Sequence, residues 1–213
     1  MIFDIVTIFP EAFSSYFNTS ILRMAQLKKK IRIRIHNLRK WTDDKHQTVD
    51  DRPFGGGPGM VMKIEPIYKA ISYLKKMKDK PYVVLFSAKG KIFDQALAQR
   101  LSKKKRLILI CGHYEGVDER VAQYLADEEI SVGKYVLTGG EIPAMILVDA
   151  VSRLLPGVIK KESLEEESFK DGQETEYPQY TRPAVFKVGK KNWSVPKVLL
   201  SGDHKKISDW RKH

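Results

Sequence analysis

The chain has 213 residues, of which 42% are hydrophobic, so it can form one large domain, or a medium domain plus a small one, and its composition argues against global disorder. A formal net charge of +12 favours an anionic partner, most often a nucleic acid, although a generically basic surface would give the same total. The single cysteine, Cys111, excludes a disulfide framework and a thiolate-rich zinc site within one chain and fits a reducing cytoplasm.

The N-terminal segments predict two strands and a helix. Residues 2–9, IFDIVTIF, are β-branched and aromatic, which is typical of a buried strand, and Pro10 ends that strand. A helix is expected over 20–30, and the strict alternation of IRIRIHNL, residues 31–38, predicts a half-exposed strand. The N-terminus carries no basic leader, and no apolar run approaches the roughly 18 residues of a membrane span, so we expect neither a signal peptide nor a membrane segment.

Residues 39–60 predict a long loop, because polar residues, two prolines and four glycines follow one another without a period. Beyond this loop the pattern alternates, with strands expected at 81–86, 106–111 and 128–133 and helices at 64–77, 93–101, 118–125 and 141–155. Such alternation predicts an α/β fold with a mostly parallel sheet flanked by helices. Ligands bind such sheets outside the carboxyl ends of the strands, and glycine-containing loops follow three of the predicted strands.

The C-terminal part differs in composition. Residues 160–176 are charged and aperiodic, which predicts a flexible linker between two domains, 1–159 and 177–213. The last segment is rich in Pro, Tyr, Trp and Lys, and we expect a small, mainly helical domain that is too short for an independent core.

Three glycine-containing motifs are candidate ligand loops. DDRPFGGGPGMVM, residues 50–62, predicts tight turns and close backbone approach, but it lacks the Gly-Lys-Ser/Thr of a nucleotide-binding P-loop, and a flexible surface loop is equally consistent with it. In CGHYEGVDER, residues 111–120, Tyr114 could stack on a base and Glu115 could accept hydrogen bonds from a guanine edge. VLTGGEIPAM, residues 136–145, is either a plain turn or a loop whose backbone approaches a ligand.

Single polar residues carry weaker signals. His113 invites a catalytic interpretation, but a lone loop histidine is more often a hydrogen-bonding or surface residue, and the other histidines show no metal-ligand spacing. Asp118 is better explained as a helix cap. Asp149 and Arg153 lie four apart, either as an exposed ion pair or as an arginine aimed at phosphate or developing negative charge. The run Glu165–Glu167 is ordinarily a solvated linker.

Taken in chain order, six segments resemble the bacterial tRNA (guanine-N1)-methyltransferases, which belong to the trefoil-knotted SPOUT class. The segments are IVTIFPEAF, DDRPFGGGPGMVM, CGHYEGVDERV, SVGKYVLTGGEIPAMILVDAVSRLLPGV, YPQYTRP and VPKVLLSGDHKKISDWR. The match spans nearly the whole chain, and RPFGGGPGM and VLTGGEIPAM are long and specific. The resemblance implies a C-terminal trefoil knot in the sheet domain, an obligate homodimer, and a cytoplasmic enzyme that binds the anticodon stem-loop of tRNA.

The activity that the resemblance implies is transfer of a methyl group from S-adenosylmethionine to N1 of the guanosine 3′-adjacent to the anticodon, at position 37 of tRNA. It also suggests a dependence on Mg²⁺, although no metal-ligand constellation is visible in the sequence. The donor would bind bent within the knot and be gripped by backbone groups. The residues implied in donor binding are Ser87, Gly112, Tyr114, Gly116, Ser131, Val132, Gly133, Lys134, Tyr135, Val136, Leu137, Gly139, Gly140 and Pro143.

A carboxylate general base must remove the N1 proton, because a protonated N1 has no lone pair with which to attack the methyl group. The family has Asp before a Ser-Phe pair in the linker, and EESF puts Glu167 at that position, a departure that keeps the carboxylate and adds a methylene. Arg153 matches the family's active-site arginine and would stabilise charge on guanine O6. The residues implied in holding the RNA are Asp50, Arg52, Gly59, Glu115, Glu176 and Arg182.

Two departures from the family pattern matter here. If Glu167 marks a lost base, the chain is instead a non-catalytic RNA-binding protein of the same fold, and this alternative stays open. In the family, helices continue beyond the segment that matches SDWR, so we expect either that this sequence is shortened or that this member has a reduced C-terminal domain. Donor binding is expected to be unaffected by that shortening.

Overall fold

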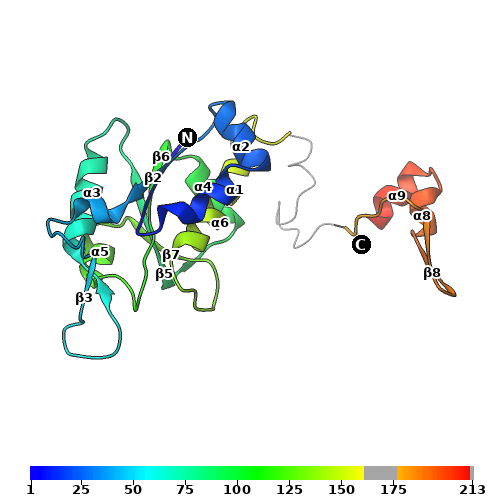
Figure 1. The fold of residues 1–213 in the computed structure, drawn as a ribbon. Helices are drawn as coiled ribbons and strands as arrows, with labels where there is room; N and C mark the ends of the chain where they lie inside the picture. The colour runs from blue at the N-terminus through cyan, green and yellow to red at the C-terminus, as the bar shows by residue number, and fades with distance from the viewer. Residues whose placement is uncertain (161–176, 212–213) are drawn as a thin grey trace. The chain divides into compact units, whose positions relative to one another are not determined.

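The computed structural model describes residues 1–160 and 177–211 (Figure 1). The chain divides into two compact units after residue 161, and each unit is described here by itself. Within the described residues, no helix has both the length and the apolar character that a bilayer crossing requires.

The first unit is built on a five-stranded sheet in which every neighbouring pair is parallel, as the alternating pattern predicted. The strands are β1 Ile2–Thr7, β2 Arg32–Asn37, β5 Tyr82–Ile92, β6 Arg106–Ile110 and β7 Glu128–Ser131. Their order across the sheet is β2-β1-β6-β5-β7. β5 continues beyond its predicted end, because its pairing with β7 shifts register after Phe86 and resumes at Lys91.

Helices cover both faces of this sheet (Figure 1). One face packs against the 3-10 helix η1 Pro10–Phe13, α1 Ser14–Phe17, α2 Ser20–Leu27, α4 Gln95–Ser102 and α6 Glu141–Arg153, and the other against α3 Ile64–Lys75 and α5 Glu119–Tyr124. Buried apolar side chains form one cluster on each face. The RLILI run of β6 contributes to both, as expected of a strand that is covered on two sides.

Local signals fix several helix ends. Asp118 caps α5 by accepting a hydrogen bond from the backbone N–H of Arg120 at 3.0 Å, as the sequence predicted. The helix expected over 20–30 ends earlier, at Leu27, because Lys29 has a positive φ of 56° that a continuing helix does not allow.

The loop expected at 39–60 contains short elements. The 3-10 helix η2, Leu38–Trp41, follows β2, and β3 Asp50–Asp51 pairs antiparallel with β4 Val61–Met62. We name the segment 52–60 between β3 and β4 the glycine loop. It is drawn in cyan in Figure 1, where it projects away from the sheet.

A buried ionic cluster lies within the sheet, where the sequence predicted only an apolar strand. Asp4 is fully buried, and its carboxylate accepts hydrogen bonds from Arg106 (2.7 Å), Arg34 (2.7 and 2.8 Å) and His36 (2.7 Å). Burial raises the pKa of Asp4, but the hydrogen bonds from its three partners outweigh burial and hold the pKa at about 2. The cluster therefore ties β1 to β2 and β6 through a charged carboxylate.

The second unit contains a hairpin and two short helices. The hairpin pairs β8 Val185–Val188 with β9 Lys191–Ser194, and Gly189 has a positive φ of 58° in its turn. The helices are α8 Lys197–Leu200 and α9 His204–Trp210. The prediction of a mainly helical domain was therefore incomplete, because it missed the hairpin, whose turn contains Gly189.

Candidate ligand-binding site

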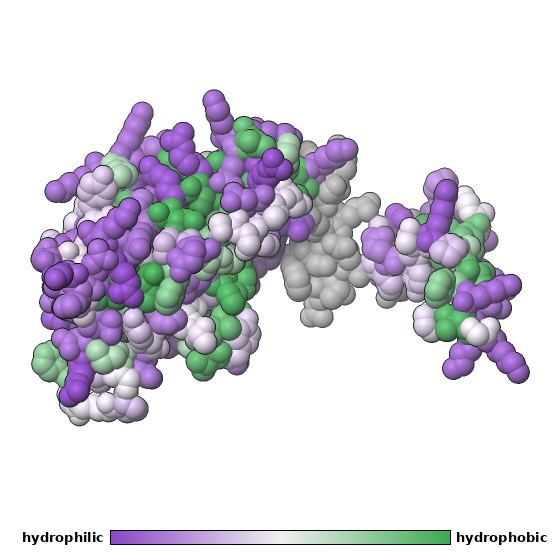
Figure 2. Space-filling view, in the orientation of Figure 1, coloured by the Kyte–Doolittle hydropathy of each residue, from purple (hydrophilic) through white to green (hydrophobic). Residues whose placement is uncertain are grey.

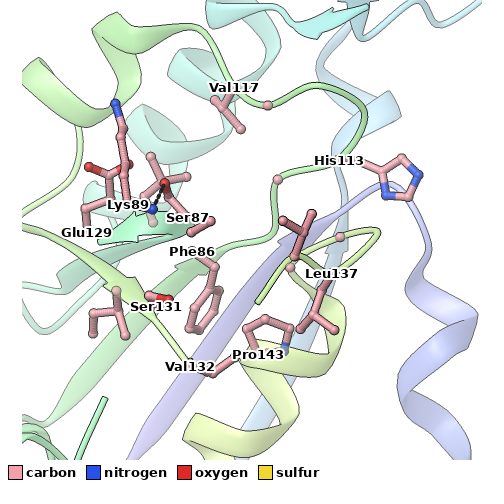
Figure 3. Close-up of a pocket in the computed structure, with 18 of the residues that line it drawn as sticks. Phe86, Ser87, Lys89, His113, Val117, Glu129, Ser131, Val132, Leu137 and Pro143 are labelled. Atoms are coloured by element: carbon pink, nitrogen blue, oxygen red, sulfur yellow. Dashed lines mark hydrogen bonds and ion pairs between the residues drawn. The ribbon is translucent and has the colours of Figure 1, made fainter. Parts of the chain in front are cut away.

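A pocket of about 500 Å³ opens at the carboxyl ends of β5, β6 and β7 (Figure 3). Its lining comes from the segments 85–89, 112–117, 129–133 and 135–140, with side chains of α5 and Pro143 of α6. Two of the three predicted glycine-containing loops, those after β6 and β7, thus meet at one edge of the sheet, where parallel α/β folds bind ligands. The third, SAKG, is not a loop but part of β5, at the register shift, and its first three residues line the pocket. The volume lies in the range of small-molecule sites.

The loop between β7 and α6, residues 132–140 and named here the wall loop, packs its backbone against the segment that follows β6. The N–H of Gly140 donates to the carbonyl of Gly112 at 2.8 Å. A Cβ on Gly140 would lie 2.5 Å from the Cα of Cys111, so only glycine allows this contact. TGGE is therefore more than a plain turn, because its glycines bring two loops of the pocket into backbone contact.

Hydrogen bonds from Ser131 at the end of β7 and within the wall loop brace its backbone. Ser131 Oγ donates to the Gly133 carbonyl at 2.9 Å, and Tyr135 OH donates to the Val132 carbonyl at 3.2 Å. Val136 in the same loop is 88% exposed, and Figure 2 shows hydrophobic residues where Figure 1 draws this loop. The loop thus lines the pocket with a braced backbone while it exposes apolar side chains to solvent.

Buried polar groups connect the end of β1 to the start of α6, next to the wall loop. Thr7 Oγ donates to Glu141 Oε1 at 2.7 Å and accepts from the N–H of Phe9 at 2.9 Å, which links the end of β1 to the start of α6. Burial raises the pKa of Cys111 well above its usual range, and the negative charge of Glu141 adds to that effect. Cys111 is therefore a neutral thiol, which is a poor nucleophile.

His113 lies at the margin of the pocket, and its ring makes edge contacts with Phe9 and Tyr114, each with centroids 5.0 Å apart (Figure 3). Its backbone forms an antiparallel bridge with Gly139, where a Cβ would approach His113 Nδ1 to 2.7 Å. Nδ1 is buried without a hydrogen-bond partner in the described part of the chain. No group of three potential metal ligands gathers among the described residues, at His113 or elsewhere. These contacts assign His113 to packing.

Lys89 bridges the rim of the pocket, and sequence reasoning did not select it. Its ammonium pairs with Glu119 of α5 and lies 3.9 Å from a carboxylate oxygen of Glu129 of β7, and the backbone N–H of Lys89 donates to Ser87 Oγ at 3.3 Å (Figure 3). The hydrogen bond with Glu119 raises the pKa of Lys89. The pattern offered only its place in SAKG after a predicted strand, and a lone lysine on a basic chain carries little signal.

The pocket is acidic although the protein is basic. Among its described lining residues, Lys89 is the one lysine or arginine, whereas Glu115, Glu119 and Glu129 are carboxylates. The aromatic ring of Phe86 and the ring of Pro143 provide apolar surface beside them (Figure 3). Such a site suits a ligand with a flat apolar part and a positive charge.

The structure gathers most of the residues expected to bind a donor. All of them except Lys134 line the pocket, namely Ser87, Gly112, Tyr114, Gly116, Ser131, Val132, Gly133, Tyr135, Val136, Leu137, Gly139, Gly140 and Pro143. Of the residues expected to hold RNA, Glu115 lines the pocket as well. Gly59 of the glycine loop lies against Glu115, because a Cβ on Gly59 would be 2.4 Å from Glu115 Oε1.

Other expected site residues lie outside the pocket lining. Asp50 is in β3 and Arg52 opens the glycine loop. Arg153 is the last residue of α6, one turn beyond Asp149, which accepts a hydrogen bond from the hydroxyl of Tyr16. Arg182 belongs to the second unit, and two acidic residues fall outside the described residues, Glu167 and Glu176.

Comparison with known proteins gives consistent matches over the whole chain. The family model described as tRNA (Guanine-1)-methyltransferase TrmD matches residues 1–213. A tRNA (guanine-N(1)-)-methyltransferase of Dictyoglomus turgidum is 58% identical over 210 residues, which cover 98% of this chain and 82% of the relative. The enzyme of that name from Carboxydothermus hydrogenoformans is 55% identical over 210 residues, covering 98% of this chain and 80% of the relative.

A solved structure shares the fold. The crystal structure of tRNA (m1G37) methyltransferase from Aquifex aeolicus aligns with a TM-score of 0.82 and 42% sequence identity. The alignment covers 99% of this chain and 87% of the Aquifex chain. The similarity therefore includes the strands and loops that form the pocket.

Proposed function

The chain belongs to the tRNA (guanine-1)-methyltransferase family, and from this premise we propose that it transfers a methyl group from S-adenosylmethionine to N1 of the guanosine at position 37 of tRNA. The observation that carries the proposal is the pocket at the carboxyl ends of β5, β6 and β7, with its glycine-built wall. The names of the relatives support the substrate class and the atom that is methylated.

The pocket residues fit the proposed donor. The donor supplies a methyl group on a positively charged sulfonium, and the carboxylates of the lining favour that charge. Glycines at 112, 139 and 140 let backbone N–H and C=O groups approach an adenine edge, which main-chain donors and acceptors can read. Phe86 and Pro143 would cover the faces of the ring.

Catalysis requires a group that removes the N1 proton of guanine. We assign this role to the carboxylate of Glu167 and the stabilisation of charge on guanine O6 to Arg153. Asp50, Arg52, Gly59 and Glu115 would hold the displaced guanosine and its neighbour from the glycine-loop side, which the contact between Gly59 and Glu115 supports. In addition, Glu176 and Arg182 are assigned to tRNA binding, by the linker and by the small C-terminal domain 177–213.

We also propose the trefoil knot and the homodimer of the SPOUT class, in the cytoplasm, where tRNA is found. The backbone contact of the wall loop with the segment after β6 supports a threaded arrangement. Beside the wall loop, Ile142 and Ile146 of α6 are 53% and 39% exposed, an apolar surface that a second copy would bury. Sedimentation analysis tests the dimer, and titration of Mg²⁺ into the assay tests a role for that ion.

The direct test is a methylation assay with labelled S-adenosylmethionine and two tRNA transcripts, one with guanosine and one with adenosine at position 37. We expect methyl incorporation only into the guanosine transcript. Glu167→Gln should lower turnover by about 10²–10⁴-fold, the usual range for loss of a general base. Glu165→Gln and Glu166→Gln are the matched controls, and equal damage from either would remove the assignment. A wild-type protein that binds RNA but no donor is instead the non-catalytic alternative.

A further inference from the structure

Phe54 stands at the corner of a turn in the glycine loop. Its side chain is 100% exposed. The carbonyl of Pro53 accepts a hydrogen bond from the N–H of Gly56 at 3.3 Å, which places Phe54 at the second position of a four-residue turn. Gly55 follows with a φ of 85°, a conformation that one turn type demands at its third position and that glycine supplies. The turn therefore directs the ring outward, away from any covering side chain.

The base of the glycine loop is fixed beside the pocket. The N–H of Met62 donates to the carbonyl of Gly116 at 2.9 Å, and the N–H of Asp118 donates to the carbonyl of Met62 at 3.0 Å. The N–H of Glu115 donates to the carbonyl of Met60 at 3.0 Å. The loop is thus joined by backbone hydrogen bonds to the segment 115–118, most of which lines the pocket, while the Phe54 ring at its outer turn is covered by none of the described residues.

An exposed phenylalanine is not by itself a binding site, because single apolar residues are common on protein surfaces. The chemistry around Phe54 narrows its partner. Arg52, two residues earlier, is also exposed, and the chain carries a net charge of +12. A cation beside an aromatic ring is the combination with which proteins bind unpaired bases, through phosphate attraction and stacking. A nucleic acid therefore fits this turn better than an apolar protein surface.

We propose that Phe54 is a substrate-positioning residue that stacks on an unpaired base adjacent to the target guanosine when RNA binds. When a guanosine leaves its stack, the face of a neighbouring base loses its partner. Apolar wedges occupy such vacated faces in other nucleic-acid complexes, and a ring held at a turn corner can do so with little ordering cost. This role rests on the proposed function, since it concerns the RNA bound at the same site.

The test compares Phe54→Ala, Phe54→Leu and Phe54→Trp with the wild type on a tRNA transcript that carries guanosine at position 37. Phe54→Ala should lower kcat/KM for tRNA by about 5- to 150-fold, the range of one base–aromatic stack. Phe54→Trp should keep most of the activity because it offers an aromatic face, whereas Phe54→Leu should not. Donor affinity measured by calorimetry and the thermal unfolding temperature should stay unchanged in all three, because the Phe54 side chain is fully exposed among the residues that the structure describes.

A fluorescent readout and a control complete the design. When a transcript carries 2-aminopurine next to the target guanosine, its fluorescence should be lower in complex with the wild type or Phe54→Trp than with Phe54→Ala, because a stacked 2-aminopurine is quenched. Tyr68→Ala, which removes another exposed aromatic on α3, should leave activity and quenching unchanged.

Each contrary result has a distinct meaning. Activity of Phe54→Ala equal to the wild type overturns the inference while the proposed function stands. Equal rescue by Phe54→Leu and Phe54→Trp overturns stacking. A loss of activity that accompanies dissociation in sedimentation assigns Phe54 to a contact between two copies, which also overturns it. A wild type that methylates no transcript refutes the proposed function itself.

Discussion

Two regions of the first unit differ in what holds them together: side chains in the Asp4 cluster, and backbone contacts at the pocket. The Asp4 cluster joins three strands through charged side chains that are buried with partners. The pocket joins loops at the other ends of the strands through backbone contacts that only glycine permits. The comparison teaches that stability in this unit depends on side chains within the sheet, whereas the shape of the site depends on main chain at its edge. Substitutions should therefore separate the two properties.

The largest expected effect tests whether the buried Asp4 cluster determines the stability of the first unit. Asp4→Asn should lower the free energy of unfolding by about 3–5 kcal/mol, because the fully buried Arg106 keeps its charge and loses its partner. Denaturant unfolding measures the loss. The matched control is Asp43→Asn, whose exposed pair with Lys69 should contribute less than about 1 kcal/mol. Equal losses in the two variants would contradict a special role for the buried cluster.

The next effect tests whether backbone packing determines the shape of the pocket. Gly140→Ala should weaken donor binding by about 100-fold, because the added Cβ must push apart the backbones of the wall loop and the Cys111 segment. Calorimetry with S-adenosylmethionine measures this loss. In the same loop, Lys134→Ala should change affinity by no more than about twofold, since its side chain does not line the pocket. Equal losses in the two variants would mean that side chains, not backbone, form the wall.

A pH profile sharpens the contribution of Asp4. Its pKa is held at about 2, below the ordinary value of 3.8, so its contribution is present above about pH 4 and is lost as pH falls through 2. The difference between the two pKa values corresponds to about 2 kcal/mol of unfolding free energy. The gap in unfolding free energy between the wild type and Asp4→Asn should therefore narrow as pH falls from 4 to 2. A gap that stays constant over this range would show that the ionised carboxylate is not what stabilises the sheet.

The smallest expected effect concerns a helix cap that directly follows a pocket segment. Asp118→Ala removes the cap of α5 and should cost about 1 kcal/mol of stability, as should Asp94→Ala at the cap of α4. Asp118 directly follows the pocket segment 112–117, so only its removal should also weaken donor binding. Unfolding curves and calorimetry on both variants give the comparison. A loss of donor affinity in Asp94→Ala would show that stability and site shape are coupled after all.

Sequence patterns predicted the parallel sheet because apolar or alternating strand segments take turns with helical segments along the chain. They also brought the glycine loops to one edge, since parallel strands end together. The ion pairs of Asp4 could not be predicted in this way, because one acidic residue in IFDIVT does not indicate that it will contact arginines 30 and 102 residues away in the chain. The hairpin of the second unit was not predicted, because all residues of its two strands are exposed and so leave no pattern of buried apolar positions in the sequence.

The site divides in the same way. The backbone walls could be inferred from glycines at strand ends, and the donor-binding set came from the family resemblance on those motifs. Lys89 could not be inferred, because its role depends on glutamates from α5 and β7 that meet only in the folded chain. The exposure of Phe54 was equally hidden, since a phenylalanine in a glycine-rich run can pack inward or face solvent with the same pattern.

The main-chain wall around Gly139 and Gly140 has a consequence for evolution and for drug design. Peptide groups cannot be exchanged by point mutation, so drift in the surrounding side chains would leave the wall's contour in place. Few single substitutions would therefore give resistance to a compound that fits this contour. A substitution of Gly139 or Gly140 would weaken binding of the compound, but it would also distort the site that the enzyme needs.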